Sequence, residues 1–121
     1  RIMIIGDLNS QIGKREWGED EIIAPYQYRQ RNYNGELLID FCCENELKIE
    51  STWFKKKSNK KWTWTAPNGM KKSQTDHILT KSKNKSIKNC EVVKNFNFDT
   101  DYRLVSCVMR INKDRRKMCK I

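Results

Sequence analysis

Three aspartates stand where strand-forming runs begin or end, and their carboxylates are the groups in this sequence best suited to chemistry. Asp7 follows the apolar run at residues 2–5 and has Asn9 two positions on, Asp76 lies in a second strand-like run, and Asp101 precedes a third. A carboxylate at the end of a buried strand is destabilising unless it is paired or binds a cation. Oxygen ligands of this kind suit Mg²⁺, which stabilises charge on a reacting phosphate. For any one aspartate taken alone, the simpler explanation that it caps a turn is favoured.

Lysine-rich segments near a Trp-Thr-Trp sequence suggest a surface for nucleic acid. The chain has 25 Lys and Arg against 15 Asp and Glu, a net charge of +10, which favours a polyanionic partner. Lysines would contact phosphates and aromatic rings would contact bases or sugars. Trp62 and Trp64 share one face of a strand, however, and such a face more often packs into a core. The lysine loops can also be merely solvated. The residues expected to contact nucleic acid are Trp64, Lys55, Lys56, Lys57, Lys60, Lys61, Lys71 and Lys72.

Histidine and cysteine offer little for catalysis or metal binding. His77 is the only histidine, and because it adjoins Asp76 on a predicted strand, the two side chains point to opposite faces. The five cysteines are irregularly spaced and form no CxxC motif, so we expect reduced, mostly buried thiols in an intracellular protein, nuclear or cytoplasmic. The longest apolar run, at residues 2–5, is far too short to cross a bilayer, so no membrane partner is expected.

Short strands and one clear helix must position these residues, which predicts an α/β or α+β fold. The run at residues 2–5 indicates a strand buried on both faces, which needs neighbours on both sides, so we expect further sequence upstream. The Asn34-Gly35 pair opens a helix of about a dozen residues. Its expected apolar face consists of Leu37, Leu38, Phe41, Cys42 and Asn45. Further strands are expected at 47–53, 61–65, 70–80, 90–96 and 103–111, with a hairpin turn at 67–69, an irregular segment at 10–33 and basic loops at 55–61 and 81–89.

Three motifs in this order resemble those of the endonuclease/exonuclease/phosphatase superfamily. Residues 4–9 (IIGDLN) are similar to its GDxN motif, residues 62–64 (WTW) with 74–79 (QTDHIL) to its TW…D(Y/H/F)I segment, and residues 100–105 (TDYRLV) to its closing SDHRLV. The closest resemblance is to the apurinic/apyrimidinic-endonuclease-like domain of non-LTR retrotransposons and to the relatives called craniofacial development protein 2-like. It covers about residues 1–111.

This resemblance implies a fold and a place within it. Members of the superfamily form a four-layer αββα sandwich, in which two β-sheets pack face to face with helices outside. The chain would supply the C-terminal half of that domain through residues 1–111, with the N-terminal half missing, and residues 112–121 would form a basic tail. The implied partners are DNA, the missing N-terminal half and a reverse transcriptase domain of the parent polyprotein.

The resemblance also implies roles for individual residues. Asp7 and Asn9 would hold the attacking water and the scissile phosphate, Asp101 would bind Mg²⁺ or Mn²⁺, and Asp76 would orient a catalytic histidine. In this chain, however, Tyr102 occupies the position of that histidine. A neutral tyrosine cannot supply an imidazolium, and loss of such a group lowers a rate on the order of 10²–10⁴-fold.

Three functions follow as hypotheses. The first is part of a Mg²⁺-dependent DNA endonuclease, inactive or weakly active as this chain, with metal binding weakened by the missing half. The second is a non-catalytic basic module that binds nucleic acid or protein, which Tyr102 favours over an active enzyme. The third is a phosphatase of the same superfamily, which the basic loops and the tryptophan pair argue against.

Overall fold

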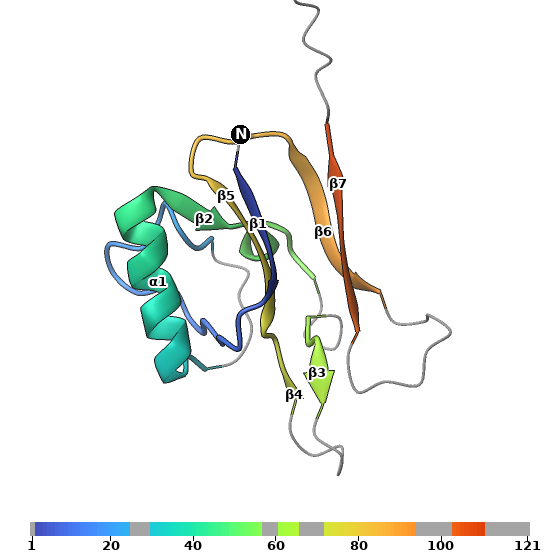
Figure 1. Ribbon diagram of the computed structural model, residues 1–121, viewed down its shortest axis with the longest axis horizontal. Coiled ribbons are helices and arrows are strands. Elements are labelled where there is room, and N and C mark those ends of the chain that lie inside the picture. The colour runs from blue at the N-terminus through green and yellow to red at the C-terminus, as the bar shows by residue number, and fades with distance from the viewer. Residues whose placement is uncertain (1, 25–29, 57–60, 66–71, 94–102, 111–121) are drawn as a thin grey trace, which may run out of the picture.

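The computed structural model describes residues 2–24, 30–56, 61–65, 72–93 and 103–110. Within these ranges the chain folds into one α-helix, a short 3₁₀ helix and seven strands, and every strand pairing is antiparallel (Figure 1). The expected combination of strands with one clear helix is confirmed as an α+β arrangement. Within the described part of the chain, no helix combines the length and the apolar character that a membrane-spanning segment needs.

The central sheet has three strands, and its middle strand carries Asp76. The strands lie in the order β1-β5-β2 and span Met3–Asp7, Asp76–Lys81 and Leu47–Ile49. In the register of the β1–β5 pair, Asp7 is directly opposite Asp76. Cross-strand partners point to the same face of a sheet, so the topology brings together two of the predicted site residues that are far apart in sequence.

Strand β1 lies at the edge of this sheet, so the prediction of a strand buried on both faces is wrong for the described residues. There β1 pairs with β5 alone, and Ile5 is 63 % exposed. Ile4, on the opposite face, packs against the main apolar core. The apolar run predicted a strand correctly but not its place at an edge, because the pattern reports side-chain polarity and not backbone pairing.

We expect Ile5→Lys to reduce self-association of the chain at high protein concentration. An open strand edge beside an exposed apolar side chain invites pairing between copies, and a lysine at an edge opposes it. Analytical ultracentrifugation would compare this variant with Leu37→Lys, which removes a similarly exposed apolar side chain from the helix. If the two substitutions reduce self-association equally, the copies associate through apolar contacts and not through strand pairing. A wild-type chain that stays monomeric at all concentrations would contradict the prediction.

Helix α1 (Tyr33–Asn45) begins one residue before the expected start at Asn34, and Asn32 caps it. The side-chain oxygen of Asn32 accepts a hydrogen bond from the backbone amide of Gly35 at 2.8 Å. This bond satisfies one of the amides that the first turn of a helix leaves without a partner. The buried face differs from the expected one, because Leu37 and Phe41 are 49 % and 44 % exposed. Its buried residues are Gly35, Leu38, Ile39 and Cys42.

The predicted hairpin is present, but its second strand is interrupted. Strand β3 (Trp64–Thr65) pairs with β4 (Lys72–Ser73), and β5 starts only at Asp76. At the break, the hydroxyl oxygen of Thr63 accepts hydrogen bonds from the amides of Thr75 at 3.0 Å and Asp76 at 3.3 Å. The Thr63 hydroxyl therefore accepts two backbone amides that a neighbouring strand would otherwise have bonded. Asp76 begins a strand and does not lie within one, and the expected turn at 67–69 falls outside the described residues.

The strand expected at 47–53 ends after three residues, at Ile49. It is followed by the 3₁₀ helix η1 (Glu50–Trp53). The hydroxyl of Thr52 donates a hydrogen bond to the carbonyl of Ile49 at 2.7 Å and accepts one from the amide of Ala24 at 3.0 Å. Such a local bond competes with continued strand pairing, which explains why the strand is shorter than predicted.

Two apolar cores cover the two faces of β5. The larger core lies between the central sheet and α1, and it includes Ile12, Ile23, Leu38, Ile49 and Leu79. The smaller core lies against the pair formed by β6 (Ile87–Val93) and β7 (Leu104–Met109). It consists of Ile78, Ile87 and Cys90, with Met3, Phe54, Val105 and Cys107 packed against it. Strand β6 starts three residues earlier than predicted, and residues 94–96 and 111 fall outside the described residues.

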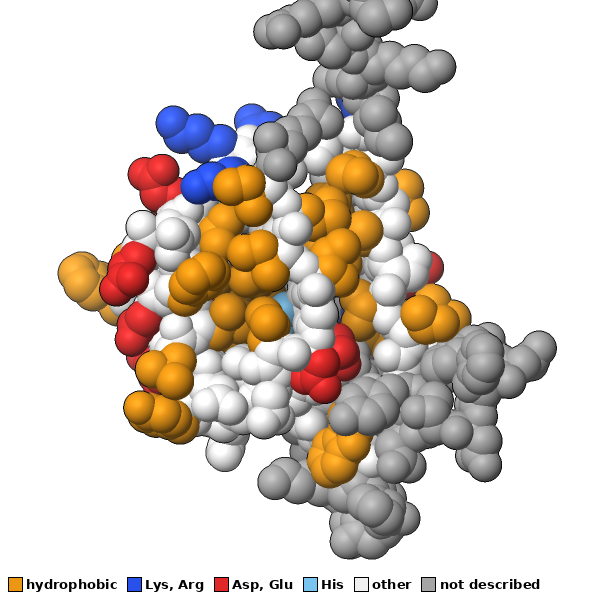
Figure 2. Space-filling model, in the orientation of Figure 1, with side chains coloured by type: hydrophobic (Ala, Val, Ile, Leu, Met, Phe, Trp, Pro, Cys, Tyr) orange, Lys and Arg blue, Asp and Glu red, His pale blue; other side chains and the backbone are white. Residues whose placement is uncertain are grey.

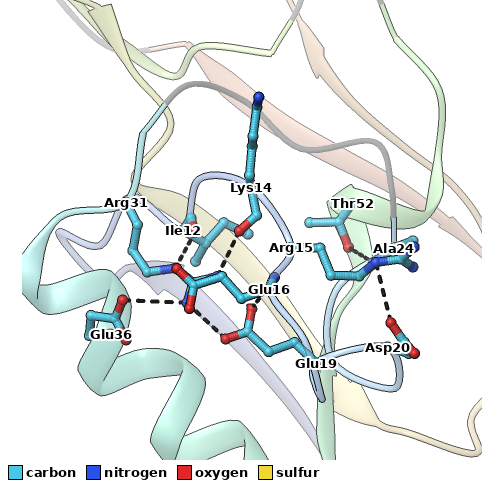
Figure 3. A network of polar contacts seen from close by, with 10 residues as sticks. All are labelled: Ile12, Lys14, Arg15, Glu16, Glu19, Asp20, Ala24, Arg31, Glu36 and Thr52. Carbon is cyan, nitrogen blue, oxygen red and sulfur yellow. Dashed lines mark hydrogen bonds and ion pairs between the residues drawn. The ribbon is translucent and has the colours of Figure 1, made fainter.

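A buried arginine fixes the irregular segment between β1 and α1. The guanidinium of Arg31, whose side chain is 7 % exposed, donates hydrogen bonds to both carboxylate oxygens of Glu19 at 2.6 and 2.8 Å (Figure 3). It also donates to the carbonyl oxygens of Ile12 at 2.6 Å and Lys14 at 3.0 Å. The hydrogen bond with Arg31 holds the pKa of Glu19 below its ordinary value, although burial acts in the opposite direction. The described residues of this segment are irregular as predicted, and Arg31 links Ile12, Lys14 and Glu19 to the start of α1.

Candidate active site

Asp7 and Asp76 form a cross-strand pair of carboxylates at one end of the central sheet. Directly opposite residues have Cβ atoms about 4.5–5.5 Å apart, so the two negative charges repel each other. Burial raises the pKa of Asp76 and the charge of Asp7 raises it further, whereas a hydrogen bond with the side chain of Thr63 acts in the opposite direction. Atom Oδ2 of Asp76 is buried and has no hydrogen-bond partner in the described part of the chain. The pair therefore presents a desolvated oxygen next to a second carboxylate.

The loop after β1 holds Asn9 beside this pair. Atom Oδ1 of Asp7 accepts a hydrogen bond from the amide of Asn9 at 2.9 Å. Asn9 has a φ of 46°, in the left-handed region that asparagine tolerates better than most residues. The side-chain amide of Asn34, in the first turn of α1, donates to the carbonyl of Asn9 at 3.0 Å. The sheet end and the helix start thus fix the backbone of Asn9 from two sides.

His77 lies on the opposite face of the sheet from the carboxylate pair, as its position next to Asp76 predicted. It is 1 % exposed, and its Nε2 atom lies 2.6 Å from the carbonyl oxygen of Ser10. Burial lowers the pKa of His77, and its Nδ1 atom has no hydrogen-bond partner within the described ranges. The contact with Ser10 places this enclosed imidazole where it supports the loop after β1.

Trp62 carries two cations on its ring, an arrangement that the sequence did not suggest. The guanidinium carbon of Arg103 lies 3.2 Å from the ring centroid, and the ammonium of Lys72 lies 4.8 Å from it. The amide of Arg103 donates to the carbonyl of Thr63 at 2.8 Å, which ties the start of β7 to the segment beside Asp76. This stack gathers two positive charges on one ring, in the residue that precedes Thr63. No spacing in the sequence signals a contact between residues this far apart.

The predicted nucleic-acid contacts differ in their surroundings. Lys55 is exposed, and Lys56, Trp64 and Lys72 are half-buried. Lys61 is only 6 % exposed, and burial lowers its pKa, which does not suit contact with an external phosphate. The structure separates the two basic loops, because loop 82–86 follows the end of β5 opposite to Asp76. Five further predicted residues lie outside the described ranges: Lys57, Lys60, Lys71, Asp101 and Tyr102.

Asp7 and Asp76 are the carboxylates that the described residues bring together at the candidate site. No group of three or more His, Cys, Asp or Glu side chains able to hold a metal ion occurs among the described residues. Of the cysteines in these ranges, Cys42 and Cys90 are buried, and burial raises the pKa of each thiol to about 12. All four described cysteines are free, but only two of them are buried, whereas the expectation was of mostly buried thiols.

The chain is similar to craniofacial development protein 2. The protein of that name from Tragulus javanicus is 30 % identical to it over 111 residues, and the one from Bos taurus is 29 % identical over 111 residues. Each alignment covers 91 % of this chain but only 19 % and 18 % of the respective relative. The chain therefore spans about a fifth of the length of the curated relatives it matches. No protein-family model matches the chain, and no solved structure matches it.

The similarity to craniofacial development protein 2 confirms one part of the resemblance expected from the motifs. It extends over most of the chain and is distant, at about 30 % identity. The name of the relative states no reaction. The assignment of Asp7, Asn9 and Asp76 to chemistry therefore rests on the three motifs and on the geometry described above.

Proposed function

We propose that the chain supplies part of a Mg²⁺-dependent site that hydrolyses phosphodiester bonds in DNA, in an endonuclease-type domain of retrotransposon origin. The observation that carries the proposal is the Asp7–Asp76 pair, with its unpartnered buried oxygen and with Asn9 bonded to Asp7. These are the aspartates and the asparagine of the motifs that resemble the superfamily. In this proposal the central sheet belongs to a four-layer αββα sandwich.

The carboxylate pair fits a hard divalent cation. Mg²⁺ is usually bound through one or two carboxylates and keeps several waters, so two aspartates suffice as protein ligands. Because Tyr102 stands at the histidine position, Asp76 has no histidine to orient. We assign it a ligand role instead: its Oδ2 atom, which lacks a partner among the described residues, would meet the ion, with Asp7 opposite it. Asp101 would add a third carboxylate by the resemblance. Such an ion, when bound, supplies positive charge that stabilises the charge developing on the phosphate.

The remaining roles follow from what each side chain can donate or accept. The side-chain amide of Asn9 can donate to a phosphate oxygen, and the second oxygen of Asp7 can orient a water molecule. Tyr102 at the histidine position leaves the phosphate without an imidazolium, so this chain is inactive or weakly active in the proposal. Positive charge for the DNA comes from the exposed side of the Trp62 stack and from Lys55 and Lys56.

A non-catalytic module that binds nucleic acid is the second candidate. Two observations favour it: Tyr102 replaces the histidine, and the chain has a net charge of +10. In that case the carboxylate pair would be a remnant of the nuclease fold. DNA binding without divalent cation, together with no cation binding at the pair, would identify this case.

We expect Asp76→Asn to weaken binding of Mn²⁺ to the chain at least about tenfold, because it removes a ligand charge from the pair. Isothermal titration calorimetry at neutral pH would measure the affinity, with Asp40→Asn as the control that removes an exposed carboxylate from α1. Cation affinity of the wild type should fall as pH falls through the raised pKa of Asp76, since the proton competes with the ion. Equal affinities for the two variants would place the cation elsewhere and contradict the proposal.

A further inference from the structure

Cationic side chains surround a pocket at the end of the central sheet opposite to Asp76. The pocket has a volume of about 620 Å³, and its cationic lining residues are Lys81, Lys83, Lys85, Lys88 and Arg110. Asn84, Ser86 and Ile2 complete the lining formed by the described residues, and none of these lining residues is a carboxylate. We call this site the basic pocket. In Figure 2, Lys and Arg side chains gather at the top of the view, where the loop between β5 and β6 lies in Figure 1.

The basic pocket is distant from the carboxylate pair. Asp76 begins β5 and Lys81 ends it, and five residue steps along an antiparallel strand span about 17 Å. The negatively charged site formed by Asp7 and Asp76 and the positively charged basic pocket therefore lie at opposite ends of one sheet. The two sites can be altered separately by substitution.

The loop that carries the lysines has a fixed backbone. Atom Oδ1 of Asn84 accepts hydrogen bonds from the amide and the hydroxyl of Ser86 at 2.7 and 2.6 Å. The ammonium of Lys48 donates to the carbonyl of Asn84, and the amide of Arg110 donates to the carbonyl of Ser86 at 2.6 Å. These hydrogen bonds already order the loop backbone, so a ligand that binds there loses little free energy to loop ordering.

Most of the charges in the basic pocket have no protein partner. Lys85, Lys88 and Arg110 are exposed, and no ion pair or side-chain hydrogen bond engages them among the described residues. Lys81 donates a hydrogen bond to the carbonyl of Asn45 at 2.9 Å. Lys81 and Lys83 also border a neighbouring pocket whose acidic lining residues are Asp20, Glu21 and Glu46. The unbalanced positive charge is therefore concentrated on the side formed by Lys85, Lys88 and Arg110.

We propose that the basic pocket binds the phosphate backbone of double-stranded DNA, without regard to sequence and separately from the carboxylate pair. Five cations exceed what one phosphate group neutralises, which favours a polymer of phosphates over a small phosphorylated molecule. The described lining residues include no aromatic side chain on which an unpaired base could stack, which favours a duplex over a single strand. Ile2 is the one apolar residue among them, and a membrane-binding surface would need a larger apolar face.

The inference does not depend on the proposed catalytic function, because phosphate contacts by lysine need no metal ion. Binding of a short DNA duplex would be measured by fluorescence anisotropy in EDTA over a series of salt concentrations. We expect Lys85→Ala and Lys88→Ala each to reduce the slope of log affinity against log salt by about 1, and Lys14→Ala to leave it unchanged. Lys14 is an exposed lysine outside the pocket and serves as the matched loss of one charge. Lys85→Arg should retain wild-type binding.

Specific results would overturn the inference. Equal losses for Lys85→Ala and Lys14→Ala would mean that net charge alone drives binding. Tighter binding of single-stranded DNA than of duplex, reduced by the same variants, would assign the basic pocket to unpaired strands. Reduced binding to phosphatidylserine vesicles with unchanged DNA binding in Lys85→Ala would assign it to a lipid surface. Lys85→Ala should leave Mn²⁺ binding unchanged, so a failure at the basic pocket is distinguishable from a failure at the carboxylate pair.

Discussion

Replacement of Arg31 by methionine is expected to lower the free energy of unfolding by about 3 kcal/mol. The substitution keeps most of the aliphatic stem but leaves the carboxylate of Glu19, whose side chain is 13 % exposed, without its bidentate partner. It also removes the donors to the carbonyls of Ile12 and Lys14. Breakage of one side of a buried pair typically costs 3–5 kcal/mol, and the residual exposure of Glu19 places this case near the lower end. Urea unfolding at neutral pH would measure the change.

The matched control is Arg15→Met. Arg15 lies 3.4 Å from Asp20, but the two side chains are 34 % and 79 % exposed, so this pair should contribute no more than about 0.5 kcal/mol. Because the folded-state pKa of Glu19 is lowered, the contribution of the Arg31 pair is fully present above the unfolded-state pKa and is lost as pH falls through the folded-state value. The difference between wild type and Arg31→Met should therefore shrink in acid. If Arg31→Met and Arg15→Met lowered the free energy of unfolding equally, the buried Arg31–Glu19 pair would not have the stabilising role assigned to it.

The second large effect concerns Tyr102. The test uses a chimera in which this chain replaces the matching segment of craniofacial development protein 2 from Bos taurus and keeps the region of that protein that precedes it. In this chimera, Tyr102→His should raise the rate of DNA nicking by on the order of 10²–10⁴-fold. The histidine would restore a cationic donor to the phosphate, which a neutral tyrosine cannot be. The rate would be measured from conversion of supercoiled plasmid to the open circle. Tyr102→Phe is the control, since it changes the same residue without supplying an imidazole. An equal rate in the three chimeras would break the assignment of the histidine role to this position.

The helix and most strands were predictable from local pattern, whereas their lengths were decided by single side chains. The helix begins one residue earlier than predicted because Asn32 caps it. The strand after it ended early because Thr52 bonds to Ile49 and Ala24. Thr63 divided another predicted strand in two by accepting the amides of Thr75 and Asp76. Each of these contacts is made by one hydroxyl or amide group. The hydrophobic pattern of the sequence does not predict such hydrogen bonds.

Part of the candidate site could be predicted from the order of the motifs and not from the hydrophobic pattern. Motif order placed Asp7 and Asp76 in one site, and the antiparallel register brings them opposite each other. The stack of Arg103 and Lys72 on Trp62 was missed, because it joins residues from separate strands and leaves no periodic signal. The ion pair of Arg31 was missed for the same reason. The basic loop at 81–89 was recognised from composition, but only the topology of β5 shows that it lies at the opposite end of the sheet from Asp76.

The most direct test of the account is plasmid nicking by the Tyr102→His chimera, with Mg²⁺ and with EDTA in parallel, and with Asp7 or Asp76 either intact or replaced by alanine. The account predicts nicking that requires Mg²⁺ and that either aspartate substitution abolishes, because the two carboxylates form one site on adjacent strands. Nicking that persists in EDTA, or that survives both substitutions, would show that the Asp7–Asp76 pair is not the centre of the reaction.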